Sequence, residues 1–342
     1  MLSDQALQRL WYQGKPRWLF VSLMPLSCLF LLVVKARRAF YKIGWFKAHK
    51  VPAAVIVVGN VTVGGTGKTP FVMWLAELMQ QRGRRVGIVL RGYGGTSTQW
   101  PRQVTSQTSA LDVGDEAVLH ARRTGAIVVA GPDRVAAAEL AIRLGAELII
   151  SDDGLQHYRL ARDAEICVLD HRRGLGTRWV LPAGPLREPS SRMRSVDLIV
   201  STVRGNDGAT CKLDSDVLAS AHIDEAISLI SGERRPLKAF IDGKVHAIAA
   251  IGHPEAFFAG LRQAGLELDM RAFADHAALT AVDIQFADQL PVLMTEKDAV
   301  KCLSFADERH WYVPLQLHVE PQDAAKVSAL IDEVLRFRLG SR

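Results

Sequence analysis

Residues 59–70 read GNVTVGGTGKTP, and this glycine-rich stretch decides the fold. It continues the apolar, β-branched run from Ala53 to Gly59, which predicts a buried parallel strand. Residues 71–82 (FVMWLAELMQQR) come next and predict a helix that ends at Gly83. A glycine-rich turn that closes in Gly-Lys-Thr between a strand and a helix is the context of a Walker A loop. The sequence therefore predicts a P-loop nucleotide-binding core.

The loop residues each have an expected task in holding ATP. Glycines let backbone N–H groups curl around phosphates, Lys68 can reach the β- and γ-phosphates, and Thr69 can ligate Mg²⁺. Thr62 replaces the first Walker A glycine, so we expect Gly64 and Gly65 to supply the flexibility. ATP and Mg²⁺ are the expected cofactors. The residues expected to cradle the nucleotide are Thr62, Val63, Gly64, Gly65, Thr66, Gly67, Lys68 and Thr69.

Two acidic pairs are candidates for the metal site and for the attacking group. Residues 147–154 (ELIISDDG) predict an apolar strand that ends in Asp152 and Asp153, as a Walker B strand does. Asp152 is the expected Mg²⁺ partner, direct or through water, although a strand-end Asx turn would leave the same pattern. Asp115 and Glu116 open an expected helix, where two acids can also simply favour the helix dipole.

Two arginine-containing turns give weaker signals. RGYGG (91–95) and GPDR (131–134) each follow an expected strand. The guanidinium groups of Arg91 and Arg134 could meet phosphate oxygens. As isolated fragments, both are more typical of surface turns.

The C-terminal third predicts a second, smaller α/β domain. After Val203 the polar run RGNDGATCKLDSD predicts a linker or an insert. This domain carries His276 directly after Asp275. A lone histidine is more often structural, but one beside a nucleotide in a two-domain cleft would suit proton transfer. Strands are expected at 245–251, 289–294 and 311–318, and helices at 255–264 and 324–339.

Residues 18–34 (WLFVSLMPLSCLFLLVV) are apolar and uncharged, at about the shortest length that spans a bilayer. Both flanks are basic, and residues 35–50 mix basic with aromatic side chains, which suits the headgroup layer. No small-residue cleavage site follows, which argues against a cleaved signal peptide. We expect membrane attachment, either as a short span or as a shallow insertion. The alternative is a buried core helix kinked at Pro25.

Composition bounds the remaining possibilities. The 342 residues are 49% hydrophobic with a net charge of +6, so the chain is folded and basic. Because the basic residues flank the apolar segment, anionic lipid is a better partner than nucleic acid. The four cysteines show no metal-ligand spacing and are expected to be reduced, which fits the cytoplasm. The expected fold is α/β, with a membrane-associated segment (1–50), a P-loop core with a mostly parallel sheet (51–205), and a linker with a smaller α/β domain (206–342).

An ordered set of motifs across nearly the whole chain resembles the tetraacyldisaccharide 4'-kinase family. Most of the motifs are weak singly, but the ordered set is specific. They are GNVTVGGTGKTP (59–70), RGYGG (91–95), GDE (114–116), GPDR (131–134), SDDGLQH (151–157), LPAGPLREP (181–189), IGHPEAFF (251–258), FADH (273–276) and LMTEKDAVK (293–301). Departures from the family pattern are Leu90, Ala117 and the run LQHY (155–158), which concern loop shape and leave the charged groups in place.

The resemblance implies transfer of the γ-phosphate of ATP to the 4'-hydroxyl of an acylated glucosamine disaccharide, at the cytoplasmic face of the inner membrane. It implies a monomer whose catalytic residues are Lys68, Asp115 and His276, with Asp115 as the base. Glu116 and Asp152 would join Thr69 around Mg²⁺. Arg134 and Asp153 would line the site and help to bind the nucleotide, and Glu188 would also line the site.

Three rival interpretations stay open from the residues themselves. A membrane-cycling partitioning ATPase would have a lysine where Val63 stands. A GTP-binding protein would have [NT]-K-x-D, whereas residues 295–298 read TEKD. A P-loop kinase of the same architecture could act on another lipid or on a soluble sugar, because the bare residues do not name the sugar.

Overall fold

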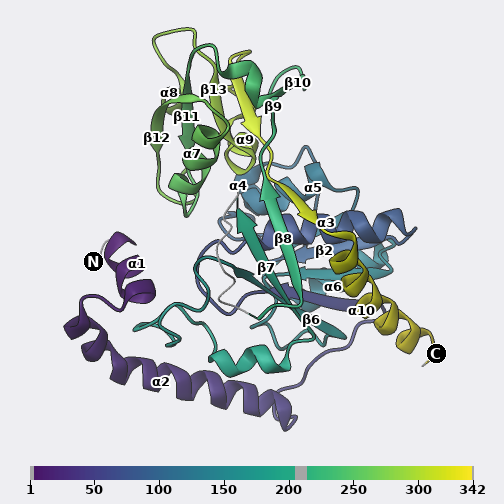
Figure 1. The fold of residues 1–342 in the computed structure, drawn as a ribbon. Helices are drawn as coiled ribbons and strands as arrows, with labels where there is room; N and C mark the ends of the chain where they lie inside the picture. Colours follow the sequence, from purple (N-terminus) through teal and green to yellow (C-terminus); the bar gives the residue numbers. More distant parts are fainter. Residues whose placement is uncertain (1–3, 205–213, 341–342) are drawn as a thin grey trace.

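The computed structural model describes residues 4–204 and 214–340. Strand β1 (Ala54–Gly59), which precedes the phosphate loop, is buried along its whole length in a nine-stranded sheet (Figure 1). The order across this sheet is β15-β8-β7-β6-β1-β5-β2-β4-β3. All neighbours pair in parallel except the two edge strands, β3 and β15. The strands other than β1 are β2 (Val86–Leu90), β3 (Arg102–Val104), β4 (Ile127–Ala130), β5 (Leu148–Asp152), β6 (Ala164–Asp170), β7 (Leu198–Arg204), β8 (Val217–His222) and β15 (Gln316–Val319).

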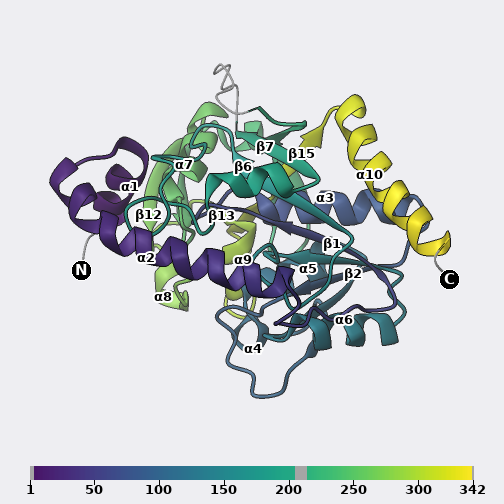
Figure 2. The same cartoon turned by 90° about the horizontal axis from the view of Figure 1, so that it is seen from below.

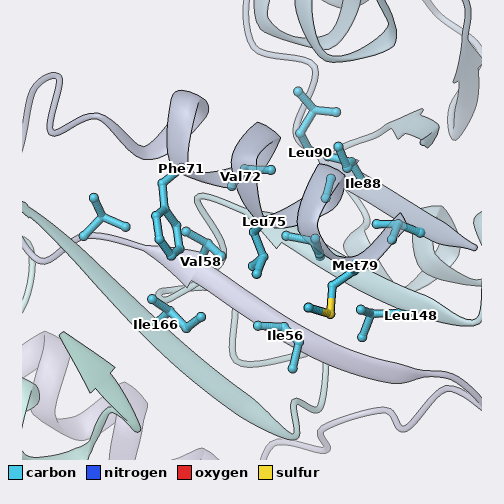
Figure 3. Close-up of a cluster of buried hydrophobic side chains, with 14 of the residues drawn as sticks. Ile56, Val58, Phe71, Val72, Leu75, Met79, Ile88, Leu90, Leu148 and Ile166 are labelled. Carbon is cyan, nitrogen blue, oxygen red and sulfur yellow. The ribbon is translucent and has the colours of Figure 1, made fainter. Parts of the chain in front are cut away.

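Both faces of this sheet are covered, which is why its central strands are continuous apolar runs. Helices α3 (Lys68–Gln81), α5 (Asp115–Arg123) and α10 (Pro321–Gly340) supply apolar residues to the core on one face. Figure 3 shows Phe71, Leu75 and Met79 of α3 pointing at the sheet, with Phe71 beside Val58 of β1 and Met79 beside Leu148 of β5. On the other face, α6 (Arg134–Arg143) packs its small residues into a second core. The expected P-loop core with a mostly parallel sheet is confirmed.

A second sheet of six strands forms the smaller unit, drawn above the first sheet in Figure 1. Its order is β10-β9-β14-β13-β11-β12. The strands are β9 (Glu225–Ser228), β10 (Arg234–Pro236), β11 (Lys244–Ala249), β12 (Glu267–Ala272), β13 (Val292–Thr295) and β14 (His310–Val313). The helices are η2 (Leu237–Phe240), α7 (Pro254–Gln263), α8 (Ala281–Ile284) and α9 (Glu296–Cys302). Two hydrophobic clusters of its own fill this unit, so it is a separate α/β body.

The structure corrects the single strand expected at 311–318. This stretch forms two strands in different sheets, β14 in the second sheet and β15 in the first. Pro314 follows β14, and proline lacks the N–H that a sheet ladder needs. After it, β15 pairs with β8, and α10 inserts Val327 and Ile331 into the core of the first sheet. The expected boundary at residue 206 is therefore corrected, since β8, β15 and α10 belong to the nucleotide-binding unit.

The N-terminal segment forms two helices, α1 (Asp4–Gln13) and α2 (Arg17–Lys42). Figures 1 and 2 both show α2 lying along the outside of the molecule, on the opposite side from the C-terminus. Pro25 lies inside α2 and does not end it. Only 11% of the most apolar 18-residue window of α2 is buried. The alternative of a buried core helix is therefore wrong.

Three of the four cysteines, Cys28, Cys167 and Cys302, lie in the described part of the chain, and all three are free of disulfides. Cys211 and most of the expected linker after Val203 lie outside the described residues.

Replacing Ile331 by alanine tests the assignment of α10 to the nucleotide-binding unit. The Ile331 side chain is fully buried in the core of the first sheet. We expect the variant to lower the free energy of unfolding by about 2–5 kcal/mol, measured by urea denaturation of the nucleotide-binding unit. The matched control is Ile230→Ala in the second unit, where the side chain is 54% exposed. Equal effects of the two variants would contradict the assignment.

Candidate active site

The phosphate loop is fixed at both of its ends. At the start, the N–H of Val63 donates to the carbonyl of Pro185 at 2.8 Å. Near the end, Asn60 Nδ2 donates to Thr66 Oγ1 at 3.2 Å, and Thr202 Oγ1 donates to the carbonyl of Thr66 at 2.9 Å. These contacts come from Asn60 directly after β1, from Thr202 of β7 and from the segment after residue 180, so neighbouring parts of the fold set the shape of the loop.

Gly67 gives the loop its final turn into α3. Its φ of +80° lies in the left-handed region, and a Cβ there would meet Thr202 Cγ2 at 2.9 Å. Only glycine adopts this conformation at no cost. Lys68 is then the first residue of α3, so its side chain and the helix N-terminus face the same edge of the sheet.

Lys68 already has an anionic neighbour. Its Nζ lies 3.5 Å from Asp153 Oδ1, and Arg187 Nη1 binds both oxygens of Asp153 at 3.0 and 3.1 Å. Burial alone would raise the pKa of Asp153, but the two cations outweigh burial and hold this pKa below its usual range. Asp153 therefore stays ionised and orients Lys68 at the mouth of the loop. Arg187 was not singled out from the sequence, although it stands in the motif LPAGPLREP.

Asp152, the expected metal partner, ends β5 beside the last residues of β1. Its Oδ2 lies 2.9 Å from His120 Nε2, and both side chains are buried. Arg134 is also buried and donates from Nη2 to the carbonyl of Asp152 at 3.4 Å and from Nη1 to the carbonyl of Gly131 at 2.9 Å. Burial lowers the pKa of Arg134 to about 10, so the group remains a cation at neutral pH. Arg134 thus joins two strand ends, and His120, which sequence reasoning missed, orients Asp152.

Asp115 and Glu116 are the first two residues of α5, as expected. Gly114 sets their position, because its φ is +88° and a Cβ there would lie 2.2 Å from the carbonyl oxygen of Tyr93. Close packing of the RGYGG turn against Gly114 therefore holds the start of the helix. Asp115 is buried, with its Oδ1 accepting from the N–H of Glu116 at 2.8 Å, whereas the Glu116 side chain is 40% exposed.

The second unit brings His276 onto Asp115, 161 residues away in the chain. His276 Nδ1 lies 3.1 Å from Asp115 Oδ2, and the backbone N–H of His276 donates to the carbonyl of Ala250. The ring of Tyr93 packs edge-on against the imidazole with centroids 5.2 Å apart. The hydrogen bond to Asp115 raises the pKa of His276 above its ordinary value. Burial would raise the pKa of Asp115, but His276, Lys297 and Lys301 together lower it.

Helix α9 adds two lysines that sequence reasoning did not assign to the site. Lys297 Nζ lies 3.3 Å from Glu116 Oε1 and 3.3 Å from His276 Nε2, and Lys301 Nζ lies 3.6 Å from Asp115 Oδ2. The only signal for them was their place in the motif LMTEKDAVK. Both lysines belong to the second unit, so the acids of α5 are neutralised from across the boundary.

Glu188 lies in a buried hydrogen-bond network. Tyr158 Oη donates to its Oε1, and Arg192 Nε donates to its Oε2 at 3.0 Å. Arg192, from the short helix η1 (Ser190–Ser195), also binds Glu165 at 2.6 Å. Both oxygens of Glu188 are therefore used in holding the segment that carries Arg187, and the expectation that Glu188 lines the site stays a prediction.

The residues proposed for Mg²⁺ fit that ion by their chemistry. Thr69, Glu116 and Asp152 offer only oxygen donors, which a hard cation prefers. Among residues 4–204 and 214–340, no group of three His, Cys, Asp or Glu side chains converges as a metal cage would. Mg²⁺ is commonly held by one or two carboxylates together with phosphate and water, so a sparse oxygen set suits it.

Lys68 and the strand-end acids lie at the carboxyl edge of one parallel sheet, and a second unit places a histidine on one of these acids. This arrangement defines the class of the protein: a P-loop nucleotide-binding α/β protein whose site is shared by two units.

Comparison with known proteins then identifies the family. The family model for LpxK, described as tetraacyldisaccharide-1-P 4'-kinase, matches residues 19–336. A tetraacyldisaccharide 4'-kinase from Nitrosococcus oceani is 46% identical, over 99% of this chain and 98% of its own length. One from Pseudomonas aeruginosa is 42% identical, over 98% and 99%. The chain belongs to this family, so the resemblance seen in the sequence is confirmed.

A solved structure agrees with the fold. The crystal structure of LpxK from Aquifex aeolicus in complex with ATP matches with a TM-score of 0.79 and 30% identity. The match covers 92% of this chain and 99% of that chain. Most of this chain therefore shares one architecture with that protein.

Replacing Gly67 by alanine tests the geometry of the loop. The alanine would have to adopt the left-handed backbone conformation, which costs about 1–2 kcal/mol, and its Cβ would press against Thr202. We expect ATP affinity to fall about tenfold or more, measured by isothermal titration calorimetry. The control is Gly243→Ala, where no atom lies within 4 Å of the added Cβ and ATP affinity should not change. An unchanged affinity in the Gly67 variant would rule out this account of the loop.

Replacing His276 by glutamine tests the link between His276 and Asp115. A histidine whose folded pKa is raised stabilises the protein fully below its unfolded pKa of about 6.5, and this stability is lost as pH rises through the folded pKa. We therefore expect the difference in unfolding free energy between wild type and His276→Gln to be largest at pH 6 and to shrink toward pH 8–9. Urea denaturation across that range measures it, and a difference that grows with pH would contradict the contact.

Proposed function

We propose that this protein transfers the γ-phosphoryl group of ATP to the 4'-hydroxyl of a tetraacylated glucosamine disaccharide 1-phosphate, a step of lipid A biosynthesis. The family name supports the reaction, and the relative from Aquifex aeolicus, which holds ATP, supports the phosphate donor. The structural observation that carries the proposal is the buried Asp115 carboxylate, 3.1 Å from His276 and at the same sheet edge as Lys68. This observation supports Asp115 as the proton acceptor for a nucleotide bound at the loop of Lys68.

Charge neutralisation is the main task of the loop side of the site. A phosphoryl group in transit carries its charge on its oxygens, so preorganised cations and N–H groups supply most of the rate. Lys68 is oriented by Asp153 toward the mouth of the loop and would contact the β- and γ-phosphates. Mg²⁺, held by Thr69 with Glu116 and Asp152, would neutralise charge on the same phosphate oxygens.

Asp115 is the group we assign as base. The sugar oxygen forms a bond to the γ-phosphorus, the bond from that phosphorus to the β–γ bridging oxygen breaks with its electron pair going to ADP, and the hydroxyl proton goes to Asp115. His276 Nε2 faces Lys297 at 3.3 Å and Asp275 at 3.8 Å, so its second nitrogen is already engaged. This favours the carboxylate as the acceptor, with His276 holding it. A carboxylate of lowered pKa suffices, because the proton leaves late in a loose transition state.

Helix α2 lies against the body lengthwise, which bears on how the protein meets a membrane. Contacts to the body run from Phe20, whose ring meets Trp179, to Tyr41, whose ring meets Tyr158. Between them, Ser27 Oγ donates to the carbonyl of Val180 at 3.0 Å. These contacts span 21 residues, or about 32 Å at 1.5 Å per residue. If α2 crossed a bilayer upright, it would lose these contacts, because the body of the protein lies in water.

Shallow insertion is therefore the form of attachment we propose. The face of α2 away from the body is apolar and exposed, and the exposed Lys35 and Lys42 in its C-terminal half are placed for anionic headgroups. The exposed apolar residues are Trp18, Val21, Leu26, Leu29, Leu32 and Val33. A substrate with four acyl chains stays in the bilayer, because each buried CH₂ contributes about 0.8 kcal/mol. The enzyme would thus work as a monomer at the cytoplasmic face of the inner membrane, where ATP is supplied.

The direct test is incubation of the purified protein with γ-labelled ATP, Mg²⁺ and the acylated disaccharide 1-phosphate in detergent. We expect label to move into the lipid, seen by thin-layer chromatography. Label entering a different component of a membrane lipid extract, and not the disaccharide, would overturn the substrate assignment.

The proposed roles predict a ranking of two variants. Lys68→Ala removes a cation from the phosphates, whereas His276→Ala removes only the group that holds the base. We expect Lys68→Ala to lose far more turnover, with the loss for His276→Ala no larger than the factor of about 10²–10⁴ that the proton acceptor itself contributes. Steady-state kinetics would measure both, and the reverse ranking would refute these roles.

The exposed face of α2 gives a second prediction. Replacing Leu29, Leu32 and Val33 by glutamine removes apolar contact with lipid and leaves the contact of Ser27 with the body intact. We expect binding to anionic vesicles to weaken at least about tenfold, with ATP affinity unchanged.

Removal of residues 1–34 should also weaken vesicle binding, but it deletes α1 and the buried Leu10 as well. Replacing Ile230 and Val282, exposed on the second unit, by glutamine is the control. Equal vesicle binding by all variants would exclude this surface.

A further inference from the structure

Helix α9 of the second unit lies against α5 of the first, at the place where Figure 1 shows the two units meeting. Ion pairs join the two helices at both ends of α5. At the C-terminal end, Arg123 Nη1 binds both oxygens of Glu296 at 2.9 and 3.1 Å. At the N-terminal end, the lysines of α9 approach Asp115 and Glu116. The start of α5 is therefore held by charges that its own unit does not provide.

The two lysines have different surroundings. Lys297 is shared among several groups: besides Glu116 and His276, it lies 3.9 Å from Asp115 and 4.0 Å from Asp275. Among the described residues, Lys301 has two acidic partners, Asp298 Oδ1 at 3.0 Å and Asp115 Oδ2 at 3.6 Å, and its side chain is only 11% exposed. Lys301 is thus a nearly buried cation aimed at the carboxylate that we assign as base.

Asp298 fixes Lys301 from behind. Its carboxylate is fully buried and accepts from the N–H of Ala250 at 2.9 Å and from Thr295 Oγ1 at 2.6 Å. The carbonyl of Ala250 in turn accepts from the N–H of His276 at 3.3 Å. One residue at the end of β11 therefore sets the backbone of His276 on one side and, through Asp298, the ammonium group of Lys301 on the other.

We propose that Lys301 is a positioning residue for phosphoryl transfer, which holds the Asp115 carboxylate in the orientation that receives His276 and the substrate hydroxyl. The proposal rests on the proposed function, since it assigns a role beside the same base. A carboxylate engaged by Glu116 N–H at one oxygen and by His276 and Lys301 at the other has one orientation instead of several. Through Lys301, helix α9 connects the second unit to the carboxylate that we assign as base.

The first test replaces Lys301 by glutamine, whose amide can still donate to Asp298 but carries no charge. Since a misplacement of about 1 Å can cost about 10²-fold in rate, we expect kcat to fall between about tenfold and 10²-fold. The KM for ATP should change less than about threefold, because Lys68 and the loop are untouched. Lys301→Arg, which keeps the charge, should recover most of kcat. A kcat within twofold of wild type for Lys301→Gln, or an arginine variant as slow as the glutamine variant, would overturn the proposal.

A double-mutant cycle separates positioning from mere folding. If Lys301 acts only through Asp115, Lys301→Gln should cost nothing further in an Asp115→Asn background, so the two losses will not multiply. Multiplied losses would show that Lys301 acts on something else and would overturn the proposal. The control is Lys326→Gln, another lysine paired with an aspartate three residues earlier, Asp323 at 2.8 Å, which should leave kcat unchanged. Thermal denaturation of each variant with ATP present checks that all of them fold.

The two proposals fail in different ways. If the wild-type protein labels no lipid, the proposed function fails before Lys301 is considered. If the wild-type protein labels the disaccharide and Lys301→Gln does so at the same rate, the proposed function stands and the role of Lys301 is wrong.

Discussion

The contact between His276 and Asp115 is the interaction on which the rest of the site depends. Each partner is placed by its own unit, Asp115 by the tight packing at Gly114 and His276 by the strand end at Ala250. The loop around Lys68 is complete within the first sheet, but the proton acceptor is complete only when the second unit lies against α5. In the proposed mechanism, the first sheet binds the phosphates, the contact between the two units holds the proton acceptor, and α9 connects the two.

The N-terminal helices are connected to the nucleotide site by a short segment of the chain. Trp11 of α1 donates from its indole N–H to the carbonyl of Pro182, and Ser27 of α2 binds the neighbouring Val180 and Ala183. The segment that anchors these helices continues through Pro185, which fixes Val63 of the phosphate loop, to Arg187, which holds Asp153. One short stretch of chain thus joins the proposed membrane surface to the nucleotide site, which gives a physical reason for the site to lie close to lipid.

Much of the fold could be predicted from the sequence, because its signals are local. The strand, glycine-rich loop and helix around Lys68 are adjacent in the chain, and Asp115 and Glu116 open α5 as their spacing indicates. The division into units could not be predicted correctly, since the pairing of β15 with β8 joins residues nearly a hundred positions apart. The same holds for the partners in the site. The contacts of His120 with Asp152 and of Lys301 with Asp115 leave no periodic pattern in the sequence. Glu188 belongs to a sequence motif, but its hydrogen-bond partners can be identified only from the structure.

The central claim is that Asp115 takes the proton of an alcohol whose oxygen attacks ATP held by the Lys68 loop. The most direct measurement is a single-turnover, rapid-quench assay of Asp115→Asn, with ATP affinity determined on the same preparation. The account predicts a rate of phosphate transfer that is lower by about 10²–10⁴-fold, with ATP affinity within a few-fold of wild type. A transfer rate equal to that of the wild-type protein would contradict it.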